Sequence, residues 1–358
     1  MATNFNLKEV ISHFPIDQTI ESYGNGHIND TYLCGQPPYI LQRINTNIFK
    51  NPVELMENID NVTAFLRKKI AAAGGNPDRE TLTVIKTHEG KNFYKLDDNN
   101  CFRVYKFITD TVAIETGEDL QILFNAGKGF GRFQNMLDDF PVEVLHETIV
   151  DFHNTPKRVE NLKAAIKADK AGRAHLVQKE IEFALECAEF ADVVVKGIAD
   201  GSIPMRVTHN DTKINNILFD AKTKDAVCVI DLDTVMPGSA LYDFGDALRM
   251  GGSTGAEDEI DLDKVWFNAE AFETFAKGYC SEMSKKLTER EKELLPFSAK
   301  LLTYECGIRF LTDYLDGDTY FKIHRENHNI DRARNQFKLV ADIAKKEDEL
   351  NKIVKGLN

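Results

Sequence analysis

Apolar positions follow two different spacings along this chain, and the change of spacing divides it into two parts. In the first part, short apolar runs alternate with turn-forming residues, which predicts β-strands at 20–23, 28–33, 39–43, 82–86 and 102–108. One helix interrupts these strands, with Asn51 suited to its N-cap and Pro52 to its first turn. Its apolar face steps by three and four residues through Leu55, Ile59, Val62, Leu66 and Ile70.

Beyond residue 108 the spacing is that of helices almost throughout. It predicts helices at about 123–140, from Asn154 to about 196, at 265–286, at 290–315 and at 331–353, with Pro296 as a kink or a boundary. No internal repeat or low-complexity linker interrupts the chain. The pattern therefore predicts an α+β protein with a small β-rich lobe over residues 1–108 and a larger helical lobe over residues 109–358.

One β-hairpin is predicted inside the helical lobe. Apolar runs at 217–219 and 226–230 flank a polar turn at 220–225. Antiparallel pairing places the start of the first strand beside the end of the second, so Asn216 and Asp231 meet at the open end of the hairpin. Asp211 lies on the loop that leads into it.

The oxygen atoms gathered at this end of the hairpin indicate a particular chemistry. The amide oxygen of Asn216 and the carboxylate of Asp231 are ligands that Mg²⁺ prefers, and Asp211 can orient or deprotonate a hydroxyl group. Together they indicate phosphoryl transfer from ATP, which depends on positioning and charge neutralisation. An isolated loop aspartate usually caps a turn, but the joint spacing with His209 favours the catalytic interpretation.

Neighbouring residues have supporting or open roles. Lys213 can reach the transferred phosphoryl group as a point charge, and a solvated loop lysine is the alternative. Asp233 either supports the metal site, binds a second ion or bonds the loop at 234–238. We expect His209 to pack beneath the catalytic loop and bond its backbone, and Asp243 to clamp the same loop.

Two glycine-rich segments differ in their context. Gly24 and Gly26 lie between two predicted strands, where peptide N–H groups can cradle a phosphate, and a plain hairpin turn is the alternative. His27, at the tip of this loop, faces either the substrate or solvent. The segment 127–131 follows no strand and keeps helical apolar spacing, so its glycines are predicted to allow close helix packing.

Composition excludes several classes of function. A net charge of −13 and a pI near 5.3 argue against general nucleic-acid or anionic-membrane binding. No apolar run is long enough for a membrane span, and the N-terminus has no signal-peptide pattern. The six cysteines are scattered without a Cys-x-x-Cys pair, which indicates reduced thiols in a cytoplasmic protein.

Residues 209–216 with 230–231 resemble the paired catalytic motifs of the aminoglycoside phosphotransferase-like kinase superfamily, which has a two-lobed, protein-kinase-like fold. Residues 24–29, 39–42, 103–108, 206–213, 230–245 and 305–311 are similar to the N-acetylhexosamine 1-kinases of this superfamily, and the similarity covers nearly the whole chain. The resemblance implies ATP- and Mg²⁺-dependent phosphorylation of the anomeric hydroxyl of N-acetylglucosamine or N-acetylgalactosamine to the sugar 1-phosphate.

The resemblance also implies roles for individual residues. Asp211 matches the catalytic base, beside Lys213, and Asn216 and Asp231 match the metal ligands, with Asp233 as a further candidate. The sugar site draws on His27, Asp211, Arg309 and Tyr320, and the nucleotide site draws on Gly24, Gly26, Gln42, Arg43 and Phe107.

One strand departs from the wider kinase pattern. Gln42 stands where a phosphate-binding lysine is expected, and Gln cannot supply positive charge. Arg43 lies on the opposite face by strand alternation and could substitute if the register were shifted by one, with Glu54 or Glu57 as its partner. The N-acetylhexosamine kinases also have Gln at this position, so the departure is compatible with that resemblance.

Arg309 and two rival functions remain open. Arg309 lies in an apolar helical run, where it either pairs with Glu305 or bonds sugar hydroxyls or the acetyl carbonyl. Tyr320 follows the end of that helix. One rival is a kinase for another small molecule, such as an aminoglycoside, choline or homoserine. The other is a non-catalytic, nucleotide-binding protein of the same fold. The sequence leaves the oligomeric state open.

Overall fold

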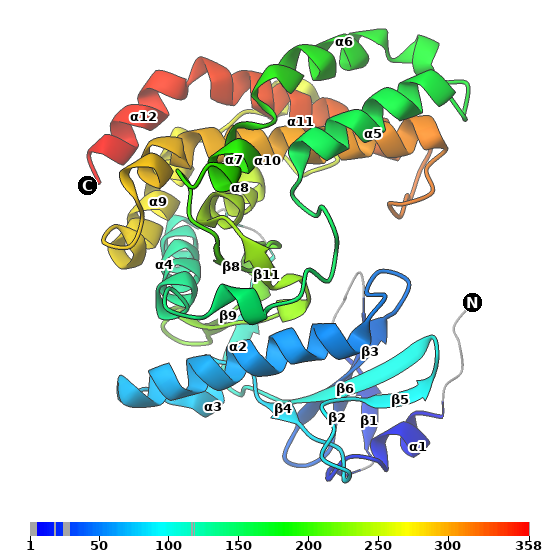
Figure 1. Ribbon diagram of the computed structural model, residues 1–358, viewed down its shortest axis with the longest axis vertical. Coiled ribbons are helices and arrows are strands. Elements are labelled where there is room, and N and C mark those ends of the chain that lie inside the picture. Colours follow the sequence, from blue (N-terminus) through cyan, green and yellow to red (C-terminus); the bar gives the residue numbers. More distant parts are fainter. Residues whose placement is uncertain (1–5, 18, 24–28, 116, 118, 358) are drawn as a thin grey trace.

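The computed structural model describes residues 6–17, 19–23, 29–115, 117 and 119–357, and it divides them into two lobes (Figure 1). The lower lobe in Figure 1 holds an antiparallel sheet with one long helix, and the upper lobe is built mostly of helices. The predicted α+β, two-lobed architecture is therefore confirmed. Within these ranges, no helix is both long and apolar enough to cross a membrane.

Antiparallel pairing joins all the strands of the small lobe into one sheet. The strands are β1 (Ile20–Ser22), β2 (Asp30–Cys34), β3 (Tyr39–Asn45), β4 (Val84–Ile85), β5 (Tyr94–Asp97) and β6 (Asn100–Lys106). Their order is β1-β2-β3-β6-β4, and β5 also pairs with β6. A strand is present at each of the five predicted places, with shifted ends. The sequence does not predict β5.

The two faces of this sheet are covered by different helices. Ile44 and Tyr105 share an apolar cluster with the helix α2 (Pro52–Ala72), whereas Leu41 and Phe102 share one with the short helix α1 (Leu7–Ile11). The predicted N-cap of α2 is confirmed, because the Asn51 side chain accepts a hydrogen bond from the backbone N–H of Glu54. Since side chains alternate along a strand, Gln42 faces the α2 side and Arg43 faces the α1 side.

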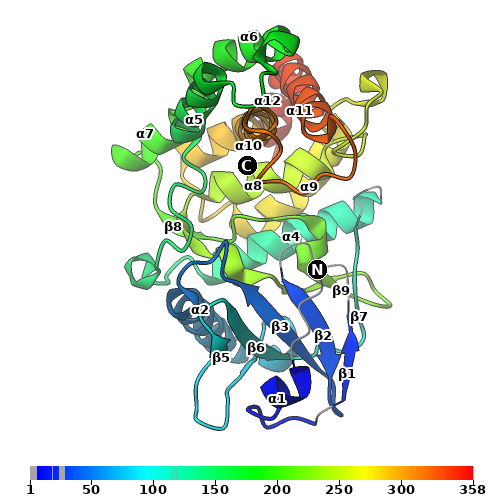
Figure 2. The same ribbon diagram turned by 90° about the vertical axis from the view of Figure 1, so that its right-hand side faces the viewer.

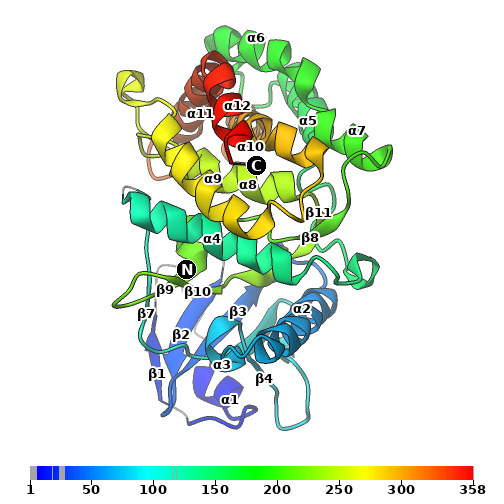
Figure 3. The ribbon, with the colours of Figure 1, turned by 90° about the vertical axis from the view of Figure 1, so that its left-hand side faces the viewer.

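The large lobe is shown from two further sides in Figure 2 and Figure 3. Its helices are α4 (Leu120–Met136), α5 (Thr155–Ala168), α6 (Gln178–Glu186), α7 (Val193–Ala199), α8 (Ala240–Gly251), α9 (Ala269–Met283), α10 (Glu289–Asp316), α11 (His328–Lys345) and α12 (Glu347–Lys355). The sequence does not predict the helix α8, whose polar residues Asp243, Asp246 and Arg249 are buried with its apolar ones.

Two predicted helix limits are wrong. The segment from 154 to 196 is three helices, because α5 ends at Asp169, whose φ of 37° is left-handed and stops the helix. The last predicted helix is divided at Lys346 into α11 and α12. The helix predicted over 290–315 is confirmed by α10, which runs through Pro296, so of the two alternatives for this residue the boundary is excluded.

Helices α4 and α9 cross at very close range, and Figure 3 shows them side by side. A Cβ atom at Gly127 would lie 2.2 Å from the carbonyl oxygen of Phe275, and one at Gly278 would lie 2.1 Å from that of Phe124. The predicted role of the 127–131 segment in close helix packing is confirmed.

We expect Gly127→Ala to destabilise the fold by about 1–3 kcal/mol or more, because the added methyl group meets backbone that cannot move aside. Urea unfolding measures this change. Gly356→Ala is the matched control, since a Cβ there meets its nearest atom at an ordinary 3.4 Å. Equal stability of the two variants would contradict the packing argument.

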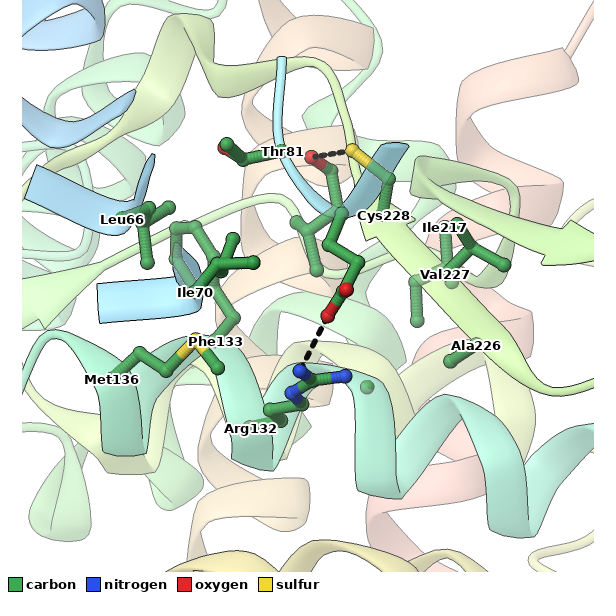
Figure 4. Close-up of a pocket in the computed structure, with 13 residues that line it drawn as sticks. Leu66, Ile70, Thr81, Arg132, Phe133, Met136, Ile217, Ala226, Val227 and Cys228 are labelled. Atoms are coloured by element: carbon green, nitrogen blue, oxygen red, sulfur yellow. Dashed lines mark hydrogen bonds and ion pairs between the residues drawn. The ribbon is translucent and has the colours of Figure 1, made fainter. Parts of the chain in front are cut away.

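The short helix α3 (Pro77–Glu80) of the small lobe forms ion pairs with the large lobe. Arg79 pairs with Asp220 at 2.8 Å, and Glu80 pairs with Arg132 of α4 at 2.5 Å. Figure 4 shows the second pair beside a small pocket, which is lined mainly by apolar side chains such as Leu66. Both lobes therefore meet around the strands β9 (Ile217–Asp220) and β10 (Ala226–Val229).

Candidate active site

The predicted hairpin is confirmed as β9 and β10, which lie in Figure 1 where the large lobe faces the small lobe. Ile217 pairs with Val229, and the backbone N–H of Ile230 donates to the carbonyl of Asn216 at 2.9 Å. Asn216 and Asp231 therefore lie side by side at the open end. The strand β7 (Thr111–Ala113) pairs with the other edge of β9, so the hairpin is part of a three-stranded sheet.

Asp231 has an unusual backbone conformation. Its φ of 57° and ψ of 55° are left-handed, which is uncommon for a residue with a side chain. Such conformations concentrate at functional sites, where the surrounding structure holds them in place. Here the turn ends β10 and begins the loop that returns to β11 (Met236–Gly238).

The carboxylate of Asp211 lies between a cation and an amide. Its Oδ1 is 2.9 Å from Nζ of Lys213, and its Oδ2 accepts a hydrogen bond from Nδ2 of Asn216 at 3.3 Å. Burial would raise the pKa of Asp211, but the charge of Lys213 holds it below its ordinary value. The Asp211 side chain keeps 22% of its exposure, so an ionised carboxylate is presented at the surface of the site.

Backbone hydrogen bonds clamp the loop that carries Asp211. Asp243 accepts from the N–H groups of His209 and Asn210 at 2.9 and 2.7 Å, so its predicted clamping role is confirmed. The ring of His209 lies beneath the loop, where Nε2 donates to the carbonyl of Ile230 at 2.8 Å and Nδ1 accepts from the Asp211 N–H. This confirms the structural role predicted for His209.

Charge is unevenly balanced among three neighbouring carboxylates. Burial and the charges of Asp233 and Asp211 raise the pKa of Asp231 to about 7. Asp211 pairs with Lys213 and Asp233 pairs with Arg103, whereas Asp231 forms no ion pair with any residue that the structure describes. A bound cation would relieve this repulsion.

The donor set fits Mg²⁺. Within the described ranges, no group of three or more His, Cys, Asp or Glu side chains is arranged to hold a metal. Mg²⁺ does not need one, because it is usually held by one or two protein oxygens and completes its shell with water and substrate phosphates. The Asp231 carboxylate and the Asn216 amide oxygen supply that number.

A sequence model of the phosphotransferase enzyme family matches residues 19–285. The chain belongs to this family. The predicted membership of the aminoglycoside phosphotransferase-like kinase superfamily is thereby confirmed.

Solved structures share the fold of this phosphotransferase at low sequence identity. An aminoglycoside phosphotransferase from Alicyclobacillus acidocaldarius is 10% identical with a TM-score of 0.64, over 99% of this chain and 97% of that one. Spectinomycin phosphotransferase, in complex with ADP and spectinomycin, is 15% identical with a TM-score of 0.61 over 96% and 98%. Amicoumacin kinase, in complex with AMP-PNP, Ca²⁺ and amicoumacin, is 14% identical with a TM-score of 0.60 over 95% and 92%.

In this phosphotransferase, Gln42 lies beside a cation that comes from the neighbouring strand. Gln42 of β3 is paired in register with Arg103 of β6, and its Oε1 accepts from Nε and Nη2 of Arg103 at 3.1 and 2.9 Å. Nη1 of Arg103 lies 2.5 Å from Asp233, and only 1% of the Arg103 side chain is exposed. Burial would lower the pKa of Arg103, but Asp233 raises it, so the pair is ionised. The small lobe thus places an arginine where its lysine is missing.

Both carboxylate oxygens of Asp233 are bound by side chains of the small lobe. Its Oδ1 pairs with Arg103, and its Oδ2 accepts from Nδ2 of Asn29 at 2.7 Å. This arrangement favours Asp231 over Asp233 as the metal ligand. The assignment of Asp233 to the metal stays a prediction.

The other predicted nucleotide residues have different surroundings. Arg43 pairs with Asp30 at 2.7 Å on the α1 side of the sheet, so the strand register is not shifted. Phe107 follows β6 and contacts the ring of Tyr23 edge-on at 5.8 Å. Glu57, one proposed partner of Arg43, pairs with His146 at 2.7 Å instead. Gly24, Gly26 and His27 lie outside the described residues.

Arg309 is surrounded by aromatic rings. Its guanidinium lies 5.8 Å from the ring centre of Phe152, 6.0 Å from that of Tyr320 and 5.4 Å from that of Phe321. The carboxylate of Glu305 is engaged by His153 and Thr155 at 2.8 and 2.6 Å. The two predicted sugar residues Arg309 and Tyr320 are therefore brought together.

Sequence reasoning missed Arg103, Asn29 and His153 as parts of the site. A signal existed for Arg103, because an arginine within the apolar run of β6 requires a buried partner. Nothing local distinguishes Asn29 or His153, whose partners come from distant segments.

Proposed function

We propose that this phosphotransferase transfers the γ-phosphoryl group of ATP to the anomeric hydroxyl of N-acetylglucosamine or N-acetylgalactosamine, with Mg²⁺, and so forms the sugar 1-phosphate. The observation that carries the proposal is that His153 connects the loop of Asp211, through Asn210, to Glu305 of α10, the helix on which Arg309 lies among aromatic rings. Aromatic faces and a guanidinium fork suit a neutral sugar with an acyl carbonyl. The resemblance of several sequence segments to N-acetylhexosamine 1-kinases narrows the acceptor class to N-acetylhexosamines.

Each residue has a defined task in this reaction. Asn216 and Asp231 would hold the metal, which neutralises charge on the transferred phosphoryl group when bound. Asp211 orients the acceptor hydroxyl and receives its proton, while Lys213 keeps the carboxylate ionised by pairing with it. Because phosphoryl transfer relies on positioning more than on a strong base, the lowered pKa of Asp211 is compatible with this task.

Other acceptors are the main alternative, since superfamily structures include an aminopropanol kinase and antibiotic kinases. A polycationic acceptor would be repelled by Arg309, which favours a neutral one. ATP turnover against a panel of acceptors decides between them, and phosphorus NMR of the product reports whether phosphate joins the anomeric oxygen. Turnover with another class and none with N-acetylhexosamines would overturn the substrate assignment.

We expect Arg309→Met to raise KM for the N-acetylhexosamine by about ten- to a hundredfold, the value of a lost charged hydrogen bond. KM for ATP should change less than about twofold, because Arg309 faces the acceptor. Steady-state kinetics in both substrates measure the change. Arg173→Met is the matched control, since Arg173 also lies over an aromatic ring, that of Tyr314 at 4.7 Å, but pairs with Asp318.

A further inference from the structure

His153 links the catalytic loop to α10 but has no task in the mechanism above. Its Nε2 lies 3.2 Å from the carbonyl oxygen of Asn210, the residue immediately before the base. Its Nδ1 lies 2.8 Å from Oε1 of Glu305 on α10. Only 7% of the His153 side chain and 2% of the Glu305 side chain are exposed, so water does not compete for these contacts.

The geometry determines the charge of this ring. A carbonyl oxygen and a carboxylate oxygen can only accept, so each ring nitrogen that faces one must donate. A histidine that donates from both nitrogens is an imidazolium. Burial would lower the pKa of His153, but the charge and hydrogen bond of Glu305 raise it above its ordinary value. The same contact holds the pKa of Glu305 below its ordinary value, so both partners are ionised.

Charged groups from three helices lie near the pair formed by His153 and Glu305. They are Arg309, which shares α10 with Glu305, Asp246 of α8 and Arg158 of α5. The ring of Tyr242, also on α8, lies 4.9 Å from the ring of His153. The second oxygen of Glu305 accepts from the Thr155 hydroxyl at 2.6 Å, which fixes the carboxylate on its other side.

The carbonyl that His153 binds belongs to a strained residue. Asn210 has a φ of 65°, which is left-handed, and Asp243 holds its N–H. The side chain of Asn210 donates to the carbonyls of Thr208 and Thr234 at 3.2 and 2.8 Å. With His153 on its carbonyl, the backbone N–H, the backbone carbonyl and the side-chain amino group of Asn210 are all held, which fixes the start of the Asp211 backbone.

We propose that His153 is a positioning residue: as an imidazolium bonded to Glu305, it holds the Asn210 carbonyl and thereby aligns the Asp211 carboxylate with the acceptor-binding face of α10. The inference rests on the proposed function, because Glu305 lies one helical turn before Arg309, the candidate acceptor residue. Loss of the ring proton would remove one of the two donors and release one end of this link.

The test is the pH profile of kcat. His153 is protonated below its raised pKa, so kcat should fall as pH rises through that value. Glu305→Gln removes the charge that raises the pKa, so the alkaline limb should move to lower pH. His153→Gln should abolish this limb and lower kcat by about ten- to a hundredfold, with KM for ATP nearly unchanged, because a small displacement of the base has effects of this size.

The chain offers a matched control. His146 and Glu57 form the same kind of contact at 2.7 Å, but with 38% and 51% of their side chains exposed. His146→Gln should leave the limb in place. An alkaline limb that stays at the same pH in Glu305→Gln, or that persists in His153→Gln, would overturn the proposal.

Two further measurements need no acceptor. An NMR titration of the His153 ring, identified by its loss in His153→Gln, reports its protonation in the wild type. Hydrogen exchange at residues 209–213 should be faster in His153→Gln and unchanged in His146→Gln. If no acceptor is phosphorylated, the proposed function fails. A protonated His153 ring and slow hydrogen exchange at residues 209–213 in the wild type would still support the link between His153 and Asn210. A neutral ring near pH 7, or equal exchange in all variants, overturns the link alone.

Discussion

Asp211→Asn lowers kcat by about 10²–10⁴-fold while ATP still binds, because the variant keeps the shape of the side chain but cannot accept the hydroxyl proton. The proposed metal ligands Asn216 and Asp231 keep their own side chains, so the nucleotide–metal site should persist. An ADP-release assay gives kcat, and calorimetry with an ATP analogue gives the dissociation constant.

The control for this variant lies on the same hairpin. Asp225→Asn changes an exposed carboxylate in the turn between β9 and β10, where it accepts from the Thr223 hydroxyl. Its turnover should equal that of the wild type. Wild-type turnover in Asp211→Asn would remove the base role, whereas loss of nucleotide binding would show that Asp211 instead supports the metal site.

Arg103→Met destabilises the protein by about 3–5 kcal/mol, because it leaves Asp233 buried without a counter-ion between the lobes. The same loss should weaken nucleotide binding, since Asp233 is two residues from the proposed metal ligand Asp231. Denaturant unfolding measures the first effect, and calorimetry with an ATP analogue measures the second.

Arg43→Met is the matched control from the adjacent strand. Its ion pair with Asp30 has a similar length, 2.7 Å, but the side chains are 23% and 49% exposed, so the expected loss is only about 0–1 kcal/mol. The double variant Arg103→Met/Asp233→Asn should recover part of the stability, because it removes the unpaired charge. Equal losses for Arg43→Met and Arg103→Met would contradict the buried pair.

Local pattern was sufficient for much of the fold and for the centre of the site. The strands of the small lobe, the N-cap at Asn51 and the hairpin beside Asn216 and Asp231 depend on neighbours in sequence, which periodicity and turn chemistry report. The errors occur where local signals are weak or overridden. A left-handed Asp169, for example, ends the first of the helices into which one charged amphipathic run is divided.

The partners of the charged groups could not be predicted in the same way. The sequence offers Arg43 as the substitute for the lysine that is missing at Gln42, yet the cation beside Gln42 is Arg103, on a strand that becomes its neighbour only in the sheet. For Asp233 the sequence offers the metal, a second ion or its own loop, and the partners that the structure gives it are Arg103 and Asn29 of the other lobe.

The sequence by itself determined the two-lobed plan, the hairpin and the grouping of oxygen-bearing side chains at its open end, because each arises from spacing within one segment. Only the tertiary structure decided which of these carboxylates has a counter-ion, and so which one we propose for the metal. It also placed His153 between the base loop and Glu305. The physical reason is that burial makes an unpaired charge very costly, so charges are paired by proximity in the folded lobes and not by position along the chain.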